Sequence, residues 1–278
     1  MSDYTSKPPI IVAIDLDGTL LPETKKVPFF TKKYLRKISK KGVKIVIASG
    51  RPNHAVEEFS RQVGSTAPVI CFNGTLAYHP NDDSFPIFAK LYDKNTIKKI
   101  VREFIDAKVV ENVLIEDAMN TWLLKSDDYL ERFFWIKNHQ RPVIYGDIHD
   151  TLNKNPLTAV FKLIRNEKND QEILKIIEKY PNHEFRFWGL APYGELYQTG
   201  SSKAEALREV AKFYNVDMED IIAFGDSFND IEMLQEVGIG IAMKNGREVV
   251  KNICKKESLH DNEHEGVKKT LRKLIKFK

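Results

Sequence analysis

The chain has 278 residues, a net charge of +4 and 42% hydrophobic residues. That length favours two domains over one, and the composition is typical of a globular protein without a bias toward disorder. No uninterrupted apolar segment has the length of a membrane span. Even the apolar run Ile10–Ile14 is ended by Asp15. The N-terminus lacks the pattern of a signal sequence, so we expect a cytoplasmic protein without a membrane partner.

Cysteine and lysine usage narrows the choice further. The two cysteines, Cys71 and Cys254, are too few for a disulfide framework or a metal site built on thiolates, and Cys71 lies in an apolar run typical of a core. The excess positive charge is scattered lysine, densest near the C-terminus, where Leu271, Leu274 and Ile275 recur at helical spacing. We therefore expect those lysines on a solvated helix face, and no nucleic-acid partner.

Strands and helices alternate in the first part of the chain. The β-branched run Ile10–Ile14 predicts a strand buried on both faces of a parallel sheet, and a helix with apolar residues at helical spacing follows it up to Gly42. Next come a strand at Val43–Ala48, a helix at Asn53–Val63 and a strand at Val69–Phe72. This alternation predicts an α/β fold with a Rossmann-like, doubly wound parallel sheet.

The pattern changes between residues 78 and 196. Segments that alternate apolar and polar residues predict an antiparallel sheet, at Val113–Leu124, Leu157–Ile164 and Glu184–Trp188. Helices are expected near Thr96–Ala107, Asp127–Asn138 and Gln171–Lys179. We predict that residues 78–196 form an inserted α+β domain, a cap carried by the α/β core.

The first pattern returns after residue 196. A helix at Lys203–Tyr214, a strand at Ile221–Phe224, a helix at Asp230–Glu236 and a strand at Ile239–Ala242 are expected, followed by helices to the end. Residues 1–77 and 197–278 are therefore predicted to complete one sheet. Ligands bind beyond the carboxyl ends of the strands in such sheets, so polar clusters at those ends are predicted to converge on one site.

Two aspartates directly follow the first strand. Asp15 and Asp17 are two residues apart in an extended segment, so both side chains face the same way, and Gly18 permits a sharp turn after them. Two carboxylates this close repel each other, which a divalent cation relieves. Alone, the pair would also be compatible with a solvated Asp-Gly turn.

A serine follows the second strand in Ser49-Gly50-Arg51. Its hydroxyl and the nearby backbone N–H groups, opening a helix, suit an anionic oxygen, although serine is also a common helix cap.

A lysine stands where a helix is expected to begin. Ser202 and Glu205 have the spacing of a capping box, which places Lys203 in the first helical turn. A cation is unfavourable at that end of the helix dipole, so Lys203 is better explained by contact with a phosphate.

A second acidic pair follows the strand at Ile221–Phe224. Asp226 lies at the strand end, and Asp230 lies four residues later at the start of a helix. Hard oxygen ligands of this kind suit Mg2+. Together the clusters provide what phosphoryl transfer needs: a nucleophile, cations beside the phosphate oxygens and a proton for the leaving group.

These motifs resemble the four motifs of the haloacid dehalogenase superfamily, and the position of the insert resembles the Cof-type subgroup with an α/β cap. The residues that carry the resemblance are Asp15-Leu16-Asp17-Gly18-Thr19, Ser49, Lys203 and Gly225-Asp226-Ser227-Phe228-Asn229-Asp230. The likeness covers nearly the whole chain. One departure is Ala204, where relatives usually carry glycine after the lysine.

The resemblance implies a role for each motif residue. Asp15 is the nucleophile and Asp17 the general acid and base. The metal Mg2+ is held by Asp15, Asp226 and the Asp17 carbonyl, with Asp230 as their support. The phosphate is held by a set that comprises Ser49, Gly50, Arg51, Asn73, Lys203 and Asn229. The implied activity is a phosphatase acting on a small phosphorylated metabolite, such as a sugar phosphate, through an aspartyl-phosphate.

Other functions are weighed against this one. A signalling receiver would be a single small domain without the insert, and a transport ATPase would need membrane helices. A phosphomutase shares fold and intermediate and stays open, as does a non-catalytic sugar-phosphate sensor, although both aspartates of the first motif are present. The insert offers Trp122, Arg186, Trp188 and Tyr193 as contacts for the leaving group, each at least as well explained as core or surface. The substrate and the oligomeric state are not predicted.

Overall fold

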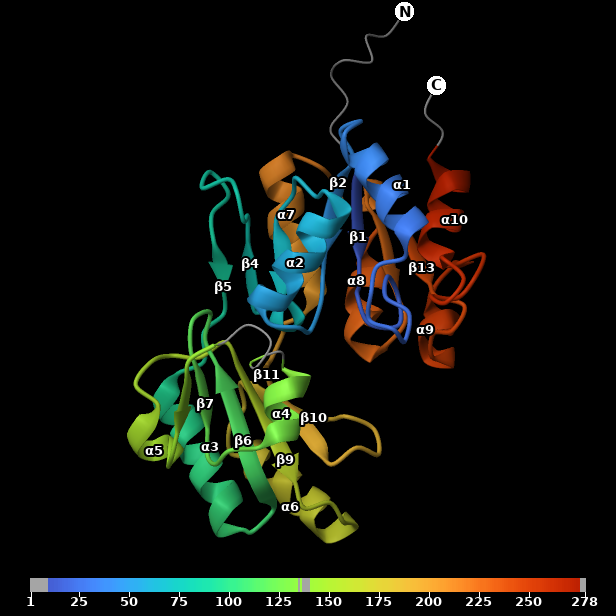
Figure 1. The fold of residues 1–278 in the computed structure, drawn as a ribbon. Coiled ribbons are helices and arrows are strands. Elements are labelled where there is room, and N and C mark those ends of the chain that lie inside the picture. Colours follow the sequence, from blue (N-terminus) through green and yellow to red (C-terminus); the bar gives the residue numbers. More distant parts are fainter. Residues whose placement is uncertain (1–9, 135, 137–140, 276–278) are drawn as a thin grey trace, which may run out of the picture. The chain divides into compact units, whose positions relative to one another are not determined.

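The structure, a computed structural model, describes residues 10–134, 136 and 141–275 (Figure 1). The chain divides into two compact units: unit 1 comprises Met1–Phe88 and Ser202–Lys278, and unit 2 comprises Ala89–Ser201. The predicted insert, residues 78–196, overlaps most of unit 2, and its exact limits remain a prediction. No helix within the described ranges is long and apolar enough to cross a membrane.

Unit 1 is built on a parallel sheet with β1 at its centre. The sheet has the order β14-β13-β12-β1-β2, with β1 at Ile11–Ile14, β2 at Lys44–Ile47, β12 at Ile222–Gly225, β13 at Ile239–Ala242 and β14 at Lys256–Glu257. All of its neighbouring strands are parallel. Every residue of β1 is buried, as a strand covered on both faces must be.

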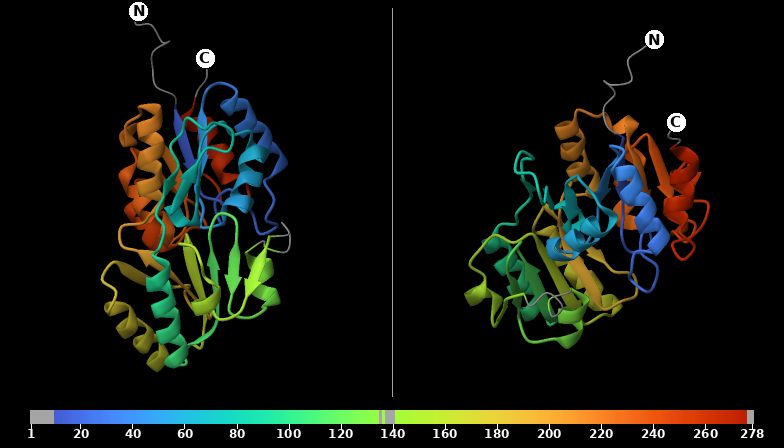
Figure 2. Two further views of the ribbon diagram at one scale, coloured as in Figure 1. Left: turned by 90° about the vertical axis from the view of Figure 1, so that its left-hand side faces the viewer. Right: turned by 45° about the horizontal axis from the view of Figure 1, so that its top comes forward.

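Helices cover both faces of this sheet (Figure 2). They are α1 at Phe29–Ser39, α2 at Asn53–Val63, α7 at Lys203–Tyr214, α8 at Ile231–Glu236, α9 at Glu248–Ile253 and α10 at Gly266–Leu274, with 3-10 turns η2 at Phe72–Gly74, η3 at Met218–Asp220 and η4 at Phe228–Asp230. Ile11 and Ala13 of β1 share a core cluster with Ala204 and Leu207 of α7. The doubly wound α/β fold is therefore confirmed.

A short hairpin extends unit 1 beyond β2. The strand β3 at Val69–Cys71 continues the sheet through a parallel bridge between Ala48 and Ile70, and then pairs antiparallel with β4 at Leu76–Tyr78. A further strand, β5 at Phe88–Ala89, completes this small sheet. Cys71 is fully buried in β3, as predicted.

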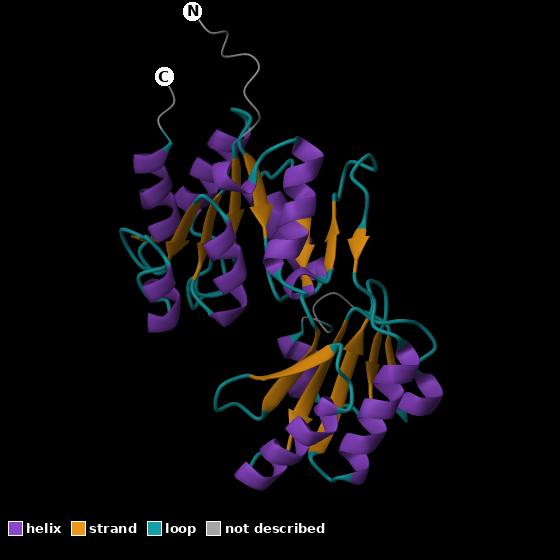
Figure 3. Cartoon of the chain, turned by 180° about the vertical axis from the view of Figure 1, so that it is seen from behind, coloured by secondary structure: helices purple, strands orange, loops and turns teal. Residues whose placement is uncertain are grey.

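Unit 2 has its own sheet with helices packed against it (Figure 3). Its order is β10-β11-β9-β6-β7-β8, with β6 at Val110–Glu116, β7 at Thr121–Leu123, β8 at Val143–Tyr145, β9 at Thr158–Leu163, β10 at His183–Phe187 and β11 at Tyr193–Gln198. The helices are α3 at Lys94–Asp106, α4 at Asp128–Phe133, α5 at Ile148–Thr151 and α6 at Glu167–Glu178. Unit 2 therefore has the α+β composition that was predicted for the insert.

Three details of unit 2 differ from the sequence predictions. The sheet is not purely antiparallel, because β8 joins β7 in parallel. The segment Val113–Leu124 is not one strand, since a turn at 117–120, in which the Met119 N–H donates to Asp117 Oδ1 at 2.6 Å, separates β6 from β7. The helix predicted to reach Asn138 ends at Phe133, and part of the predicted remainder lies outside the described residues.

Candidate active site

Asp15 lies at the carboxyl end of β1, where its backbone is fixed by the sheet. Its N–H donates to the carbonyl of Phe224 in β12 at 3.1 Å, so the chain continues the strand pairing up to this residue. The side chain is buried, and Oδ1 accepts from Lys203 Nζ at 2.6 Å. The sheet therefore presents one carboxylate of the first motif directly to a cation.

Lys203 is the first residue of α7 and is fully buried. Ser202 caps this helix, with its Oγ accepting from the Glu205 N–H at 3.3 Å, so the predicted cap is confirmed. Lys203 Nζ also donates to Asp230 Oδ1 at 2.7 Å. Burial alone would lower the pKa of Lys203, but the carboxylates of Asp15 and Asp230 outweigh it and raise that pKa above its usual value. The lysine is therefore a permanent cation between two aspartates.

Asp226 follows β12 and meets the loop after β1. Its Oδ1 accepts from Thr19 Oγ1 at 2.8 Å. Gly18, at φ +80°, lies so close that a Cβ there would come within 2.5 Å of Asp226 Oδ2. Only glycine fits, both because of the left-handed backbone and because of this approach. The Asp-x-Asp-Gly pattern thus serves to bring two strand ends together.

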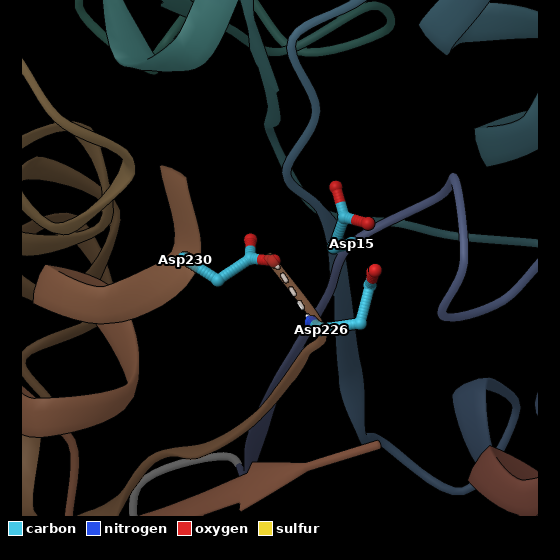
Figure 4. A group of neighbouring side chains, drawn as sticks. All are labelled: Asp15, Asp226 and Asp230. Carbon is cyan, nitrogen blue, oxygen red and sulfur yellow. Dashed lines mark hydrogen bonds between the residues drawn. The ribbon is translucent and has the colours of Figure 1, made fainter. Parts of the chain in front are cut away.

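Asp15, Asp226 and Asp230 form a carboxylate cluster whose nearest oxygens all lie within 4.8 Å of one another (Figure 4). Burial raises the pKa of Asp15 well above its usual range, although Lys203 opposes the shift. Burial, and then the charge of Asp230, raise the pKa of Asp226 to about 6. Both pKa values rise because the carboxylates are buried and close to one another. A divalent cation bound between them would stabilise their ionised forms.

Asp230 fixes the backbone after β12 and the ammonium of Lys203 by hydrogen bonds. Its Oδ2 accepts from the N–H groups of Asp226 and Ser227 at 3.0 and 3.1 Å, while Lys203 takes Oδ1. Both of its oxygens are thus engaged. By contrast, Oδ2 of Asp226 has no hydrogen-bond partner among the described residues. The donor set fits Mg2+, which prefers one or two carboxylates, and the free oxygens belong to Asp15 and Asp226 rather than Asp230.

Asp17 is the one motif aspartate that lies outside this cluster. Arg51 donates to both of its oxygens, Nε to Oδ2 at 2.6 Å and Nη2 to Oδ1 at 2.7 Å, and Lys25 Nζ donates to Oδ1 at 2.7 Å. Burial would raise the pKa of Asp17, but the hydrogen bonds and charge of Arg51 outweigh it and lower that pKa. The structure therefore separates the two aspartates of the first motif by their partners.

Three polar residues that follow different strands, Ser49, Asn73 and Asn229, are connected by hydrogen bonds. Asn73 Oδ1 accepts from Asn229 Nδ2 at 2.8 Å, and the Asn73 N–H donates to the carbonyl of Ser49 at 3.1 Å. A Cβ on Gly50 would lie 2.7 Å from Asn73 Oδ1. One expectation is wrong: Ser49 does not open a helix, because α2 starts four residues later with Pro52 at its cap position.

Contacts in the loop after β1 were not predicted from the sequence. Lys25 reaches Asp17, Thr19 reaches Asp226, and Asn245 Nδ2 donates to the carbonyl of Gly18 at 2.7 Å. Thr19 belongs to the first motif, which is a signal that was available. Lys25 and Asn245 stand in no pattern, and only the folded loop brings them to the site.

The four aromatic or basic residues proposed as leaving-group contacts lie in unit 2 and are mostly explained by packing. Trp122 is fully buried in the core and donates to the carbonyl of Thr151 at 3.1 Å. The rings of Trp188 and Tyr193 contact each other in a tilted arrangement, with centroids 5.8 Å apart and planes at 47°. The guanidinium of Arg186 lies over the ring of Tyr197 at 4.3 Å. Trp122 is therefore a core residue of unit 2.

Comparisons with known proteins agree with this geometry. Residues 12–271 match the family model described as haloacid dehalogenase-like hydrolase. The 5-amino-6-(5-phospho-D-ribitylamino)uracil phosphatase YitU of Bacillus subtilis is 31% identical over 95% of this chain and 97% of its own length. The pyridoxal phosphate phosphatase YbhA of Escherichia coli is 26% identical over 87% of this chain and 90% of its own length.

Solved structures show the same fold. The crystal structure of a haloacid dehalogenase-like hydrolase from Bacteroides thetaiotaomicron superimposes with a TM-score of 0.81 at 18% identity, over 96% of this chain and all of the other. At that identity the similarity establishes the fold alone. Together with the named phosphatases, these matches confirm the predicted enzyme class, a phosphoric monoester hydrolase.

Proposed function

The chain belongs to the haloacid dehalogenase-like hydrolases, and on that premise we propose that it is a Mg2+-dependent phosphatase for a small phosphorylated metabolite. We place it in the cytoplasm, without a nucleic-acid or membrane partner. The observation that carries the proposal is the setting of Asp15, a buried carboxylate at a strand end, 2.6 Å from the buried ammonium of Lys203 and beside Asp226. Two relatives support the substrate class, since their names describe phosphatases of small phosphorylated molecules.

In the first half-reaction Asp15 attacks the phosphorus atom of the substrate. The bond from phosphorus to the leaving oxygen breaks, and that oxygen keeps the electron pair and takes a proton from the Asp17 carboxyl group. The products are an acyl phosphate on Asp15 and the free alcohol. Lys203 stays charged beside the transferred group and offsets its negative charge.

In the second half-reaction water attacks the same phosphorus atom and gives a proton to the Asp17 carboxylate. The bond between phosphorus and Asp15 breaks, which restores the Asp15 carboxylate, releases inorganic phosphate and leaves Asp17 protonated for the next cycle. We assign Ser49, Gly50, Asn73 and Asn229 to the phosphoryl group.

Mg2+ would be held by Asp15, Asp226 and the Asp17 carbonyl, with Asp230 fixing the Asp226 backbone. When bound, it neutralises the charge that develops on the phosphoryl oxygens. The residues around it keep their own tasks: Asp230 orients Lys203, and Thr19 orients Asp226.

The insert, residues 78–196, is proposed to act as a cap that admits small substrates and excludes bulk water. The chain enters the insert near Asn73-Gly74 and leaves it near Gly200, beside residues assigned to the site, so a cap hinged there could move without disturbing the core sheet. A phosphoprotein would be excluded by such a cap. A phosphomutase would return the phosphate to a sugar, whereas the proposed enzyme releases it to water.

The test is hydrolysis of an aryl phosphate and of a panel of sugar phosphates, with Mg2+ and with excess chelator. We expect turnover with release of inorganic phosphate only when Mg2+ is present, and none with Asp15→Asn, because no covalent intermediate can form. Asp220→Asn, at an exposed aspartate of η3, is the matched control. Full activity in chelator, or in folded Asp15→Asn protein, contradicts the proposal. A kcat/KM for a phosphopeptide equal to that for sugar phosphates contradicts the cap.

A further inference from the structure

The carboxylate of Asp17 is held by two cations of different kinds. Arg51 approaches it with two nitrogens, at 2.6 Å from Oδ2 and 2.7 Å from Oδ1, and its side chain is only 3% exposed. Lys25 approaches with one nitrogen, at 2.7 Å from Oδ1, and its side chain is 54% exposed. A two-pronged contact from a buried guanidinium fixes the plane of a carboxylate, whereas a single exposed ammonium does not.

Contacts of its side chain and its backbone hold Arg51 in place. Its guanidinium lies over the ring of Phe59 at 5.0 Å. Its N–H donates to Ser49 Oγ at 3.2 Å, and its carbonyl accepts from the Phe72 N–H at 3.0 Å. The arginine is thus tied to α2 below and to η2 beside it, so the direction it imposes on Asp17 is set by the fold.

The contacts leave the two oxygens of Asp17 unequal. A carboxylate oxygen has two lone pairs. On Oδ1 both are taken, one by Arg51 Nη2 and one by Lys25 Nζ, whereas on Oδ2 only Arg51 Nε makes a hydrogen bond among the described residues. One position on Oδ2 therefore remains available for a proton.

We propose that Arg51 is a positioning residue for the proton transfer and not a ligand of the phosphate: its fork, with Lys25, occupies Oδ1 and leaves Oδ2 of Asp17 to carry the transferred proton. This inference rests on the proposed function and revises the sequence prediction for Arg51. The proton on Oδ2 passes to the leaving oxygen as its bond to phosphorus breaks, and Oδ2 later takes a proton from the attacking water. The guanidinium gives up no proton in either step.

The two roles for Arg51 predict different kinetics. A 4-nitrophenolate leaving group departs without a proton, whereas an alkoxide needs one. We would measure the first half-reaction under single-turnover conditions with Mg2+, using 4-nitrophenyl phosphate and an alkyl phosphate such as a sugar phosphate. For Arg51→Lys, which loses the fork, we expect release of the alcohol to slow by about 10²-fold, the scale of general acid catalysis, and release of nitrophenol to slow far less.

Two controls separate position from charge. Lys25→Met removes the exposed cation and frees one position on Oδ1, but leaves the fork that fixes the plane of the carboxylate, so its alkyl-to-aryl ratio should change less than that of Arg51→Lys. Arg36→Lys makes the same exchange at an exposed arginine of α1, whose Nε donates to the carbonyl of Gln62 at 2.8 Å, and should leave the ratio unchanged.

Several outcomes overturn the inference. A phosphate ligand would raise KM for both substrates and slow both equally, and equal losses of this kind refute the positioning role. Arg51→Gln, whose amide reaches one oxygen, is the second variant. If neither variant folds by near-ultraviolet circular dichroism, Arg51 holds the fold and the inference fails. If the unaltered protein hydrolyses neither substrate with Mg2+, the proposed function has failed instead.

Discussion

The two units bury charge in different ways. In unit 1 the fully buried ammonium of Lys203 contacts Asp15 and Asp230 at 2.6 and 2.7 Å, so each charge has a close partner. In unit 2 the fully buried carboxylate of Glu116 accepts from Thr121 Oγ1 at 2.9 Å, but its cationic neighbour, Arg141 Nε, is 3.9 Å away. Burial raises the pKa of Glu116 to about 7, because Arg141 offsets only part of the lost hydration. The buried ammonium of Lys203 thus keeps its charge because two carboxylates contact it, whereas the buried carboxylate of Glu116, with its cation 3.9 Å away, holds a proton more readily than a solvated one.

Removal of Lys203 should have the largest effect, because two carboxylates would lose their cation at once. We expect Lys203→Met to destabilise unit 1 by about 3–5 kcal/mol, the cost of breaking a buried ion pair from one side. Hydrogen exchange of peptides that contain β1 and β12 measures this, since those strands lie at the centre of the sheet. Lys212→Met, an exposed lysine of the same helix, is the matched control. Equal protection in both variants would mean that the ion pairs do not hold this unit together.

A smaller and pH-dependent effect is expected at Glu116. The folded pKa of about 7 lies above the usual 4.5, so between these values the folded protein keeps a proton that the unfolded chain has lost. Stability should therefore fall as the pH rises from 4.5 through 7, by about 3 kcal/mol in all, and level off above that. Glu116→Gln should lack this slope and gain stability relative to the unaltered protein at pH 8.

The tryptophans make this measurement specific. The sequence has no tryptophan outside residues 89–201, and Trp122 and Trp188 lie in unit 2, so tryptophan fluorescence during urea unfolding follows that unit. Glu178→Gln, at an exposed position of α6, controls for the exchange of charge. A slope that survives in Glu116→Gln would assign the pH dependence to another group.

The same contrast explains which parts of the fold could be predicted from the sequence. Strands of unit 1 are buried on both faces, so Ile10–Ile14 appears as a continuous apolar run and differs from β1 by one residue. In unit 2 the short strand β8 was not predicted, nor was β11, because three to six residues carry little periodicity. The parallel pairing of β7 and β8 depends on contacts that no local pattern encodes.

The candidate site follows the same division. Asp15, Lys203, Asp226 and Asp230 stand at strand ends and helix starts, and the sheet brings them together as predicted. The partner of Asp17 was not predictable, since Arg51 lies 34 residues away and its direction depends on the packing against α2. The motifs therefore identify which side chains gather, while the tertiary contacts decide what each one touches.

The smallest effect compares two helix caps that make the same contact. Ser202 Oγ accepts from the Glu205 N–H at 3.3 Å at the start of α7, and Asn166 Oδ1 accepts from the Asn169 N–H at 2.9 Å at the start of α6. Replacing either by alanine should cost about 1 kcal/mol, because one N–H of the first turn loses its partner.

The two substitutions should differ in activity. Ser202 precedes Lys203, so fraying of the first turn of α7 displaces the ammonium from Asp15, and Ser202→Ala should lower kcat on an aryl phosphate. Asn166→Ala frays a helix that carries no residue of the candidate site, and kcat should stay unchanged. Unfolding followed by tryptophan fluorescence checks the loss in unit 2, and hydrogen exchange of α7 checks the loss in unit 1. If both variants lost the same activity, placement of Lys203 by its helix would not explain the effect, and the two units would be coupled in catalysis through their stability.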